Sequence, residues 1–154
     1  MINRTLMNLA ILGLLAVCSA EVVAQSPKRF SASVVTDNKQ PVVVNDLQLE
    51  FRRSGPGSYN PSEYGKQQTV PLGTGVKVGF DRIADVRFIC RVDSSKARAI
   101  VQVLIKTASG QAVESTLEGP EAAAAYLIGT TDLGGFELRL NPYESREVVV
   151  TFSR

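Results

Sequence analysis

Hydrophobic and polar residues alternate along most of the chain, and this alternation predicts β-strands. The clearest case is the stretch Ala84–Thr107, where two such segments flank the polar turn Asp93–Lys96. In the first segment every second residue from Val86 to Val92 is apolar and most of the others are charged, which indicates one buried face. The second segment, Ala99–Ile105, is apolar on both faces, as in a central strand covered on both sides. We therefore predict a β-hairpin here, which needs a second layer of structure to be stable.

The same two-residue period recurs in the rest of the chain. It is weak in Gln67–Leu72 and Ala112–Leu117. It is clear in Phe30–Val34, Val42–Phe51, Val76–Phe80, Phe136–Leu140 and Val148–Phe152. An amphipathic helix would need apolar residues at three- and four-residue spacing, so the pattern predicts an all-β protein of seven to eight short strands.

One segment departs from the β pattern. Pro120 is followed by Glu121 and then by four consecutive alanines. Proline at a helix start, an acidic residue just inside it and a run of alanines all favour helix. Gly129 is a natural stop signal. We therefore predict one short helix over Glu121–Ile128.

The inward faces of the predicted strands supply enough large apolar side chains for a single core, which indicates a single domain over residues 25–154. The side chains that we expect to meet in this core are Phe30, Leu49, Phe51, Val78, Phe80, Phe88, Val101, Val103, Phe136, Leu138, Val150 and Phe152.

The last segment, Leu138–Phe152, reads Leu-x-Leu-x-Pro-x-Glu-Ser-x-x-Val-x-Val-x-Phe. This pattern resembles the closing hairpin of many bacterial immunoglobulin-like domains. The resemblance covers about fifteen residues and implies an architecture, with no activity attached to it. The chain has no tryptophan, so the core tryptophan of antibody domains is absent. Together with the strand pattern, the resemblance predicts an immunoglobulin-like antiparallel β-sandwich.

The first two dozen residues have the composition of a secretory signal peptide. Arg4 precedes the apolar run Leu6–Val17, and small residues follow it up to Ala20 and again up to Ala24. The apolar run is shorter than the ~20 residues that a membrane-spanning helix needs. We therefore predict a signal peptide over residues 1–24, with cleavage after Ala20 as the alternative, and a periplasmic or secreted protein.

Two other fates of the leader stay open. It could be retained as an anchor, which would make the protein an accessory subunit of a membrane complex. Leu15–Cys18 also resembles a lipobox, although Val17 stands where that motif has a small residue. After cleavage only Cys90 remains, so an intramolecular disulfide cannot form, and we expect this thiol to be buried in its strand.

The composition excludes several kinds of chemistry. The chain has no histidine, so neither a histidine-based nucleophilic site nor an imidazole metal site can be assembled. Its acidic residues mostly alternate with basic ones on solvent-facing strand positions, which is typical of a solvated sheet surface. A net charge of +2 gives no electrostatic footprint for nucleic acid. We therefore expect a protein that is not an enzyme and needs no cofactor or metal.

The candidate binding surface is the segment Arg52–Lys66, which is rich in glycine, proline and serine and predicts a long surface loop. It carries Tyr59 and Tyr64, with Arg52 and Arg53 at its root. Tyrosine and arginine are the side chains most often found as binding hot spots. The alternative is a loop with no binding role, since loops are generally variable.

The expected function is therefore a protein-interaction or structural module of the bacterial cell envelope, whose partner is another envelope or secreted protein. The alternative is a domain that binds a glycan or a small ligand. Glycan sites use aromatic platforms, and the candidates for one are Tyr59, Tyr64, Tyr126 and Tyr143.

Overall fold

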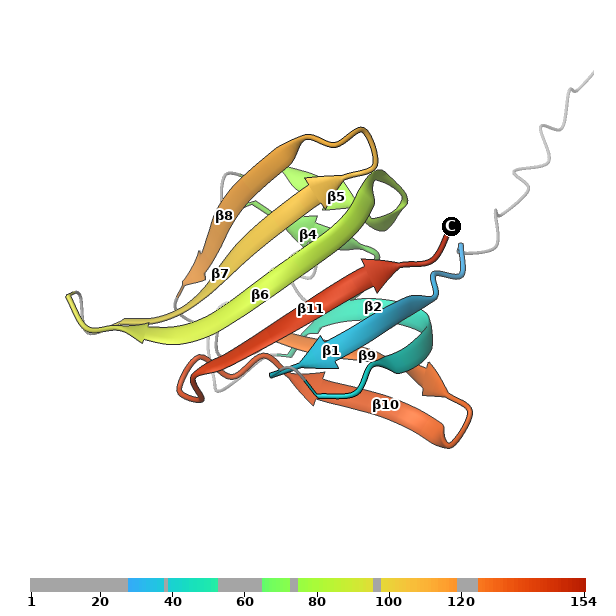
Figure 1. Cartoon of the computed structure of the whole chain (residues 1–154). Helices are drawn as coiled ribbons and strands as arrows, with labels where there is room; N and C mark the ends of the chain where they lie inside the picture. Colours follow the sequence, from blue (N-terminus) through green and yellow to red (C-terminus); the bar gives the residue numbers. More distant parts are fainter. Residues whose placement is uncertain (1–27, 38, 53–64, 73–74, 96–97, 119–124) are drawn as a thin grey trace, which may run out of the picture.

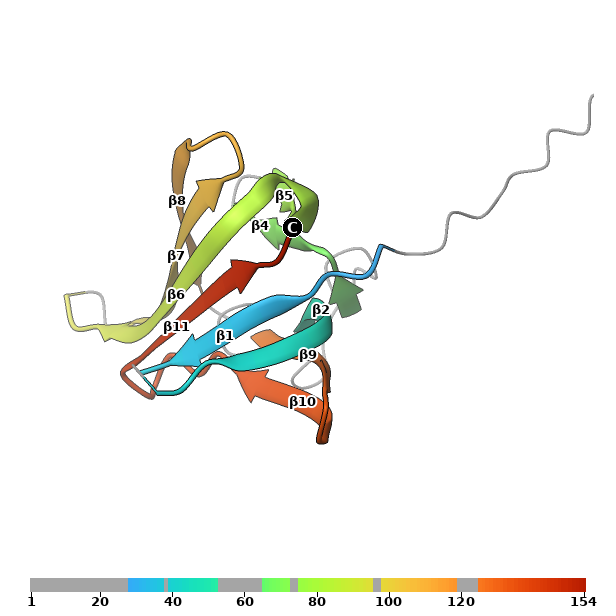
Figure 2. The same cartoon turned by 45° about the vertical axis from the view of Figure 1, so that its right-hand side comes forward.

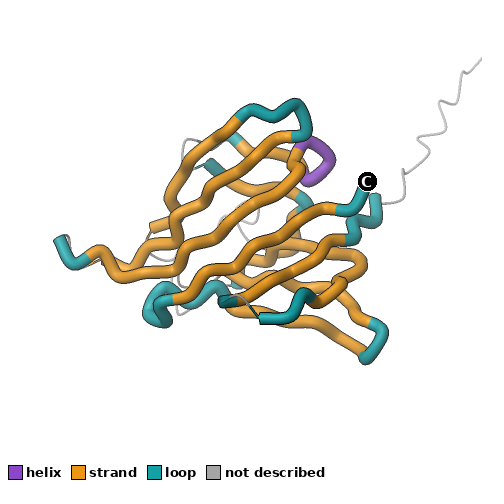
Figure 3. Tube along the Cα trace, in the orientation of Figure 1, coloured by secondary structure: helices purple, strands orange, loops and turns teal. Residues whose placement is uncertain are grey.

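A computed structural model describes residues 28–37, 39–52, 65–72, 75–95, 98–118 and 125–154 (Figures 1 and 3). In this part of the chain the structure is almost entirely β, as the alternation predicts. Its strands are β1 (Ala32–Thr36), β2 (Val42–Phe51), β3 (Gly65–Gln67), β4 (Thr69–Pro71), β5 (Lys77–Gly79), β6 (Ile83–Asp93), β7 (Arg98–Thr107), β8 (Ala112–Glu118), β9 (Ala125–Thr131), β10 (Gly134–Arg139) and β11 (Arg146–Phe152). A single 3-10 turn, η1 (Phe80–Arg82), is the helical content of the described residues.

The strands form two antiparallel sheets that share one core. The large sheet has the order β8-β7-β6-β11-β1-β2, and these strands lie side by side across the front of Figure 1. The small sheet has the order β3-β2-β9-β10 and curls behind the large one (Figure 2). A separate hairpin, β4 with β5, lies behind β6 and β7. This is a sandwich-like arrangement.

Strand β2 belongs to both sheets and turns the corner between them. Its first residues, Val42–Val44, pair with β1, whereas the residues from Gln48 onward pair with β9. The register shifts between Asn45 and Gln48, and Asp46 has a positive φ of 52°. Such a bulge bends a strand and increases its twist. The bend turns the second half of β2 away from the large sheet. In the small sheet this half of β2 lies between β3 and β9.

Gly129 on β9 lies opposite this bulge. A Cβ atom at Gly129 would lie 2.5 Å from Cγ1 of Val44 and 2.7 Å from the carbonyl oxygen of Asn45. No side chain fits there, so the two backbones approach closely because the residue is glycine. The glycine that the sequence marks as a helix stop is thus the residue that lets β9 cross the corner of the sheets.

The core confirms the inward faces that the sequence predicts. Eight of the expected core residues are buried, among them Leu49, Phe88 and Val103, and the other four, Phe30, Val78, Phe136 and Leu138, are half-buried against them. Phe80 and Phe152 pack with their ring centroids 4.8 Å apart. The core also contains residues that the sequence analysis does not single out: Ala32, Val34, Val44, Leu47, Val70, Ile83, Leu117, Ala125, Leu127, Leu140 and Val148.

The predicted hairpin Ala84–Thr107 is confirmed as β6 and β7, which pair from Ile83 and Thr107 to Asp93 and Arg98. Cys90 is 1% exposed, as its place on the apolar face requires. Val92 on the same face is 49% exposed, because the tip of the hairpin projects beyond the rest of the molecule, at the left of Figure 1.

The predicted helix is wrong where the structure tests it. Ala125–Ile128 belong to β9, and residues 119–124 lie outside the described part. Ala125 and Leu127 are buried in the core while Tyr126 and Ile128 face outward, which is the two-residue period of a strand. β9 makes ladder hydrogen bonds with β2 on one side and β10 on the other. These tertiary contacts outweigh the helix propensity of alanine.

The closing hairpin is also wrong, because β10 and β11 do not pair. β10 pairs with β9 in the small sheet, whereas β11 pairs with β1 and β6 in the large one. The turn over Asn141–Glu144 carries the chain between the sheets, and its local sequence signals do not distinguish this crossing from a hairpin. The number of strands is larger than predicted too, since β9 is added and the segment Gln67–Leu72 gives parts of β3 and β4.

The predicted signal peptide, residues 1–24, lies outside the described residues, as does Cys18. None of the helical structure in the described part is long and apolar enough to cross a membrane.

Candidate functional site

The outer face of the small sheet carries a polar cluster centred on Arg52. Leu47, Leu49 and Phe51 of β2 point into the core, so the alternate residues Gln48 and Glu50 point outward. Arg52 directly follows β2 and continues the outward series. From β9 and β10, Tyr126, Ile128 and Glu137 reach the same face, since the register pairs Gln48 with Ile128 and Ile128 with Glu137.

Arg52 bridges these strands. Its Nε donates to Oε2 of Glu50 at 2.7 Å, and its Nη2 donates to Oε2 of Glu137 at 2.6 Å. Its Cζ atom lies 4.1 Å from the centroid of the Tyr126 ring, within the range of a cation–π contact. Short charge-assisted hydrogen bonds of this kind fix the plane of a guanidinium. Arg52 therefore links β2, β9 and β10 across the outer face of the small sheet.

Arg52 and Glu137 hold each other in their charged forms. The hydrogen bonds that Arg52 donates to Glu137 and Glu50 raise the pKa of Arg52 above its usual value, with the Glu137 bond the larger cause. The bond from Arg52 in turn lowers the pKa of Glu137. Arg52 and Glu137 therefore stay charged at neutral pH, and Glu137 is a poor proton donor there.

An open groove of about 370 Å³ runs beside this cluster. One side of the groove is formed by Asp46, Gln48 and Glu50 of β2 and by Arg52, which follows the strand. The other side comes from β9 and β10. The residues that line it are Asp46, Gln48, Glu50, Arg52, Lys66, Ile128, Gly129, Thr130, Phe136 and Glu137. The volume falls within the ~300–1,000 Å³ of ordinary ligand pockets. Another hollow, near Val35 and Asp37, is much smaller, at about 30 Å³.

Of the predicted binding residues, only Arg52 lies in the described part of the chain. Arg53, Tyr59 and Tyr64 lie outside it. The predicted loop Arg52–Lys66 is wrong at its end, because Gly65 and Lys66 belong to β3. Phe51 pairs with Gly65, so the described residues on either side of positions 53–64 are neighbours in the small sheet. Arg52 and Lys66, close to these positions in the sequence, both line the groove.

The sequence pattern does not assign Glu50, Glu137, Ile128 or Thr130 to a site. The outward position of Glu50 beside Arg52 could have been inferred, because Glu50 alternates with the apolar residues of its strand two positions before Arg52. Glu137 is 85 residues away from Arg52 in the chain, and its pairing depends on β9, which the sequence predicts as helix.

Tyr126, one of the candidate glycan platforms, has Arg52 stacked on its ring. Tyr143 is 70% exposed in the turn before β11 and does not line the groove.

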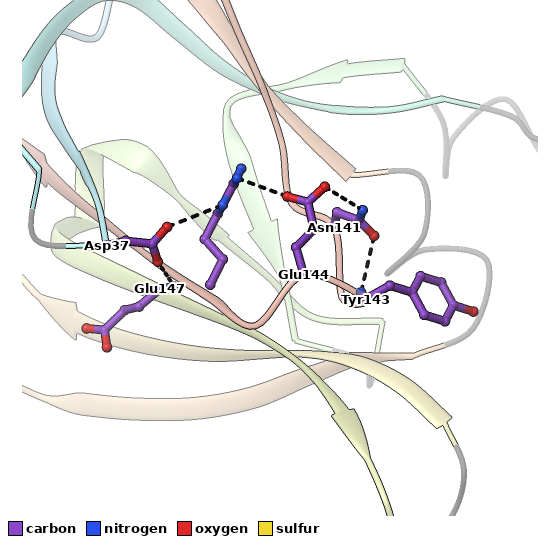
Figure 4. A network of polar contacts seen from close by, with 6 residues as sticks. Asp37, Asn141, Tyr143, Glu144 and Glu147 are labelled. Carbon is purple, nitrogen blue, oxygen red and sulfur yellow. Dashed lines mark hydrogen bonds and ion pairs between the residues drawn. The ribbon is translucent and has the colours of Figure 1, made fainter.

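A second polar cluster is centred on Arg146 at the start of β11, and Figure 4 shows its network of contacts. Its Nη2 lies 2.9 Å from Oε2 of Glu144, and its Nε lies 3.5 Å from Oδ2 of Asp37. Asn141 donates to the other oxygen of Glu144 at 3.0 Å, and the backbone amide of Glu147 donates to Asp37 at 2.9 Å. This cluster ties the end of β1 to the start of β11.

The Arg146 cluster borders the buried thiol. Arg146 pairs in register with Cys90 of β6, on the inward face of the large sheet. Burial raises the pKa of Cys90 to about 11, and the positive charge of Arg146 offsets only part of that effect. Cys90 is therefore a neutral thiol at physiological pH and not a reactive thiolate.

Within the described residues, no group of histidine, cysteine, aspartate and glutamate side chains is arranged to hold a metal ion. The chain matches no protein-family model, no curated protein and no solved structure. Functional inference for this protein therefore rests on the site itself.

Proposed function

We propose that this protein is an exported, non-catalytic β-sandwich domain that binds another protein of the bacterial cell envelope. Its binding surface is the outer face of the small sheet together with the adjoining residues 53–64. The observation that carries the proposal is the open groove lined by Arg52 and Lys66, the described residues that stand close to positions 53–64 in the sequence. Arginine and tyrosine are the side chains most often found as binding hot spots.

The non-catalytic part of the proposal is supported by the state of the acidic residues. Glu50 and Glu137 are both engaged by Arg52, and the pKa of Glu137 is lowered by that contact. A carboxyl group that acts as a general acid needs a raised pKa, which is the opposite shift. The chain also has no histidine to take that role.

We also propose that the sandwich resembles immunoglobulin domains in having two antiparallel sheets around one core. The strand order is different. In immunoglobulin domains the first and last strands, A and G, belong to different sheets, whereas here β1 and β11 pair in the large sheet.

Glycan binding is the less favoured function because its aromatic platform is weak. A sugar ring packs on the free face of an aromatic side chain, and Tyr126, the tyrosine on this sheet, carries Arg52 on its ring. Retention of the leader as an anchor is a separate alternative. The mass of the mature protein separates cleavage after Ala24, cleavage after Ala20 and retention.

The function is tested by replacing Tyr59 and Tyr64 together with alanine. We expect the double variant to keep its thermal stability, since neither residue lies in an alternating core segment. We expect its capture of the envelope partner to weaken by at least ~2 kcal/mol, the usual threshold for a hot spot. Tyr143→Ala is the matched control, because this exposed tyrosine lies away from the groove. Capture at full strength by the double variant would remove residues 53–64 from the binding surface.

A further inference from the structure

The groove on the small sheet is polar but largely neutralised. Arg52 is shared between Glu50 and Glu137, and Asp46 lies 3.6 Å from Arg29. A cationic ligand would have to break one of these ion pairs to reach a carboxylate, and an anionic ligand would find Lys66 as its partner among the described lining residues. The groove therefore disfavours a cationic ligand and favours one that carries both hydrogen-bond donors and acceptors.

The side chains along the groove offer both kinds of group. Asp46 and Glu50 can accept hydrogen bonds, Lys66 can donate them, and Gln48 can do both. The main chain of a peptide has this mixed character, with one donor and one acceptor at each residue other than proline. Ile128 adds an apolar patch to this polar lining.

The groove is elongated in the direction of a strand. It is lined by Gln48 and Glu50 of β2 and by Arg52, which follows the strand, over four residue steps or about 13 Å at ~3.3 Å per residue. Asp46, in the bulge of β2, extends the lining beyond Gln48. An extended chain has the same rise per residue, so the side chains from Gln48 to Arg52 can meet successive residues of a ligand at matching intervals. A sugar chain would gain less here, because Arg52 occupies the Tyr126 ring.

We propose that the groove binds a short extended peptide segment of the partner protein, mainly through its main chain. The segment lies along β2, over Gln48, Ile128 and Thr130, with Arg52 and Lys66 at one end of the groove. This inference rests on the proposed function, since it names the part of the protein partner that the outer face of the small sheet recognises.

The test places a photo-crosslinking amino acid in turn at Asp46, Gln48 and Glu50 of the full chain. The residue of the captured partner that reacts is then identified by mass spectrometry. Gln48 and Glu50 are two residues apart in the regular part of β2, about 7 Å, whereas Asp46 lies in the bulge. We expect the step from Gln48 to Glu50 to move the linked residue by about two positions along a single partner segment, and the link from Asp46 to continue the same order on that segment. A crosslinker at Thr151, exposed on the outer face of the large sheet, should not link this segment.

A second variant tests the groove without touching the Arg52 cluster. Thr130→Arg places a long side chain on an exposed β9 position that lines the groove. We expect it to weaken capture of the partner at least tenfold. Thr151→Arg on β11 is the matched control and should bind as the unmodified protein does.

The outcomes separate this inference from the proposed function. Links to scattered parts of the partner, links to a glycan, or full-strength capture by Thr130→Arg would each overturn the peptide groove while leaving a partner bound elsewhere on the domain. Failure of the unmodified protein to capture any partner would overturn both.

Discussion

The molecule contains two clusters built to the same plan, an arginine between two carboxylates, in different surroundings. Arg52 lies on the outer face of the small sheet with 42% of its side chain exposed, and its two hydrogen bonds are 2.7 and 2.6 Å long. Arg146, at the start of β11, has 26% of its side chain exposed, and its Nε is buried without a hydrogen bond. The exposed Arg52 cluster thus has the shorter contacts, whereas the less exposed Arg146 cluster includes one contact of 3.5 Å.

Good geometry and a contribution to stability are expected to be separate properties. An exposed ion pair adds little to the free energy of unfolding, because water solvates both partners in the unfolded chain equally well. An ion pair with a partly buried member matters more when it is broken, since removing one partner leaves the other poorly compensated. We therefore propose that Arg146 stabilises the fold and that Arg52 belongs to the binding surface.

At neutral pH, removal of Arg146 should have the largest effect on stability. In Arg146→Ala the carboxylates of Asp37 and Glu144 lose their cation. We expect a loss of about 1–2 kcal/mol in the free energy of unfolding, between the values for exposed and buried pairs, because Arg146 is half-buried whereas Asp37 and Glu144 are exposed. Urea denaturation measures it. The control is Arg87→Ala, which removes a more exposed ion pair with Glu147 in the same sheet and should cost far less. Equal losses in the two variants would contradict the structural role of Arg146.

The buried thiol gives an effect that appears only at high pH. The pKa of Cys90 is about 11 in the folded protein and 9.0 in its ordinary environment, so the folded state holds the thiol proton more tightly. The corresponding stability is fully present below pH 9 and is lost as the pH rises through 11. The complete loss should approach about 2.8 kcal/mol, from ~1.4 kcal/mol for each of the two pH units between the two values.

The same titration of Cys90→Ala isolates this effect from tyrosine and lysine ionisation. We expect the stability of the variant to fall less between pH 9 and pH 11 than that of the unmodified protein. Parallel curves would show that Cys90 keeps an ordinary pKa.

Removal of Arg52 should have the smallest effect on stability and a clear effect on binding. In Arg52→Ala the bridge over Tyr126 is lost and Glu50 and Glu137 repel each other across the groove. We expect the midpoint of urea denaturation to stay near that of the unmodified protein, while partner capture weakens several-fold because the groove loses its fixed wall. A large drop in the midpoint would place Arg52 with Arg146 as a structural residue.

The sequence predicts the parts of the fold that depend on local pattern. The hairpin of β6 and β7 and the buried position of Cys90 both follow from a two-residue period that one short segment contains. Arg52 is also identified from local composition, as an arginine at the root of a polar segment.

The parts that could not be predicted depend on distant contacts. β9 resembles a helix in its alanine content, and only its neighbours β2 and β10 make it a strand. The turn over Asn141–Glu144 is correctly recognised, but no local signal says that β11 joins a different sheet from β10. Glu137 completes the Arg52 cluster across 85 residues of sequence, so its role follows only from the strand order.

The position of β11 also determines the order in which the protein can fold. β11 lies between β1 and β6, and without it the large sheet consists of two separate pieces, β1 with β2 and β6 with β7 and β8. Pairings between such distant segments form slowly, because a long loop must first be closed. A growing polypeptide cannot complete this sheet on the ribosome before residues 146–152 emerge. Until then the large sheet is incomplete, and the polypeptide can still pass through a narrow pore in an extended form.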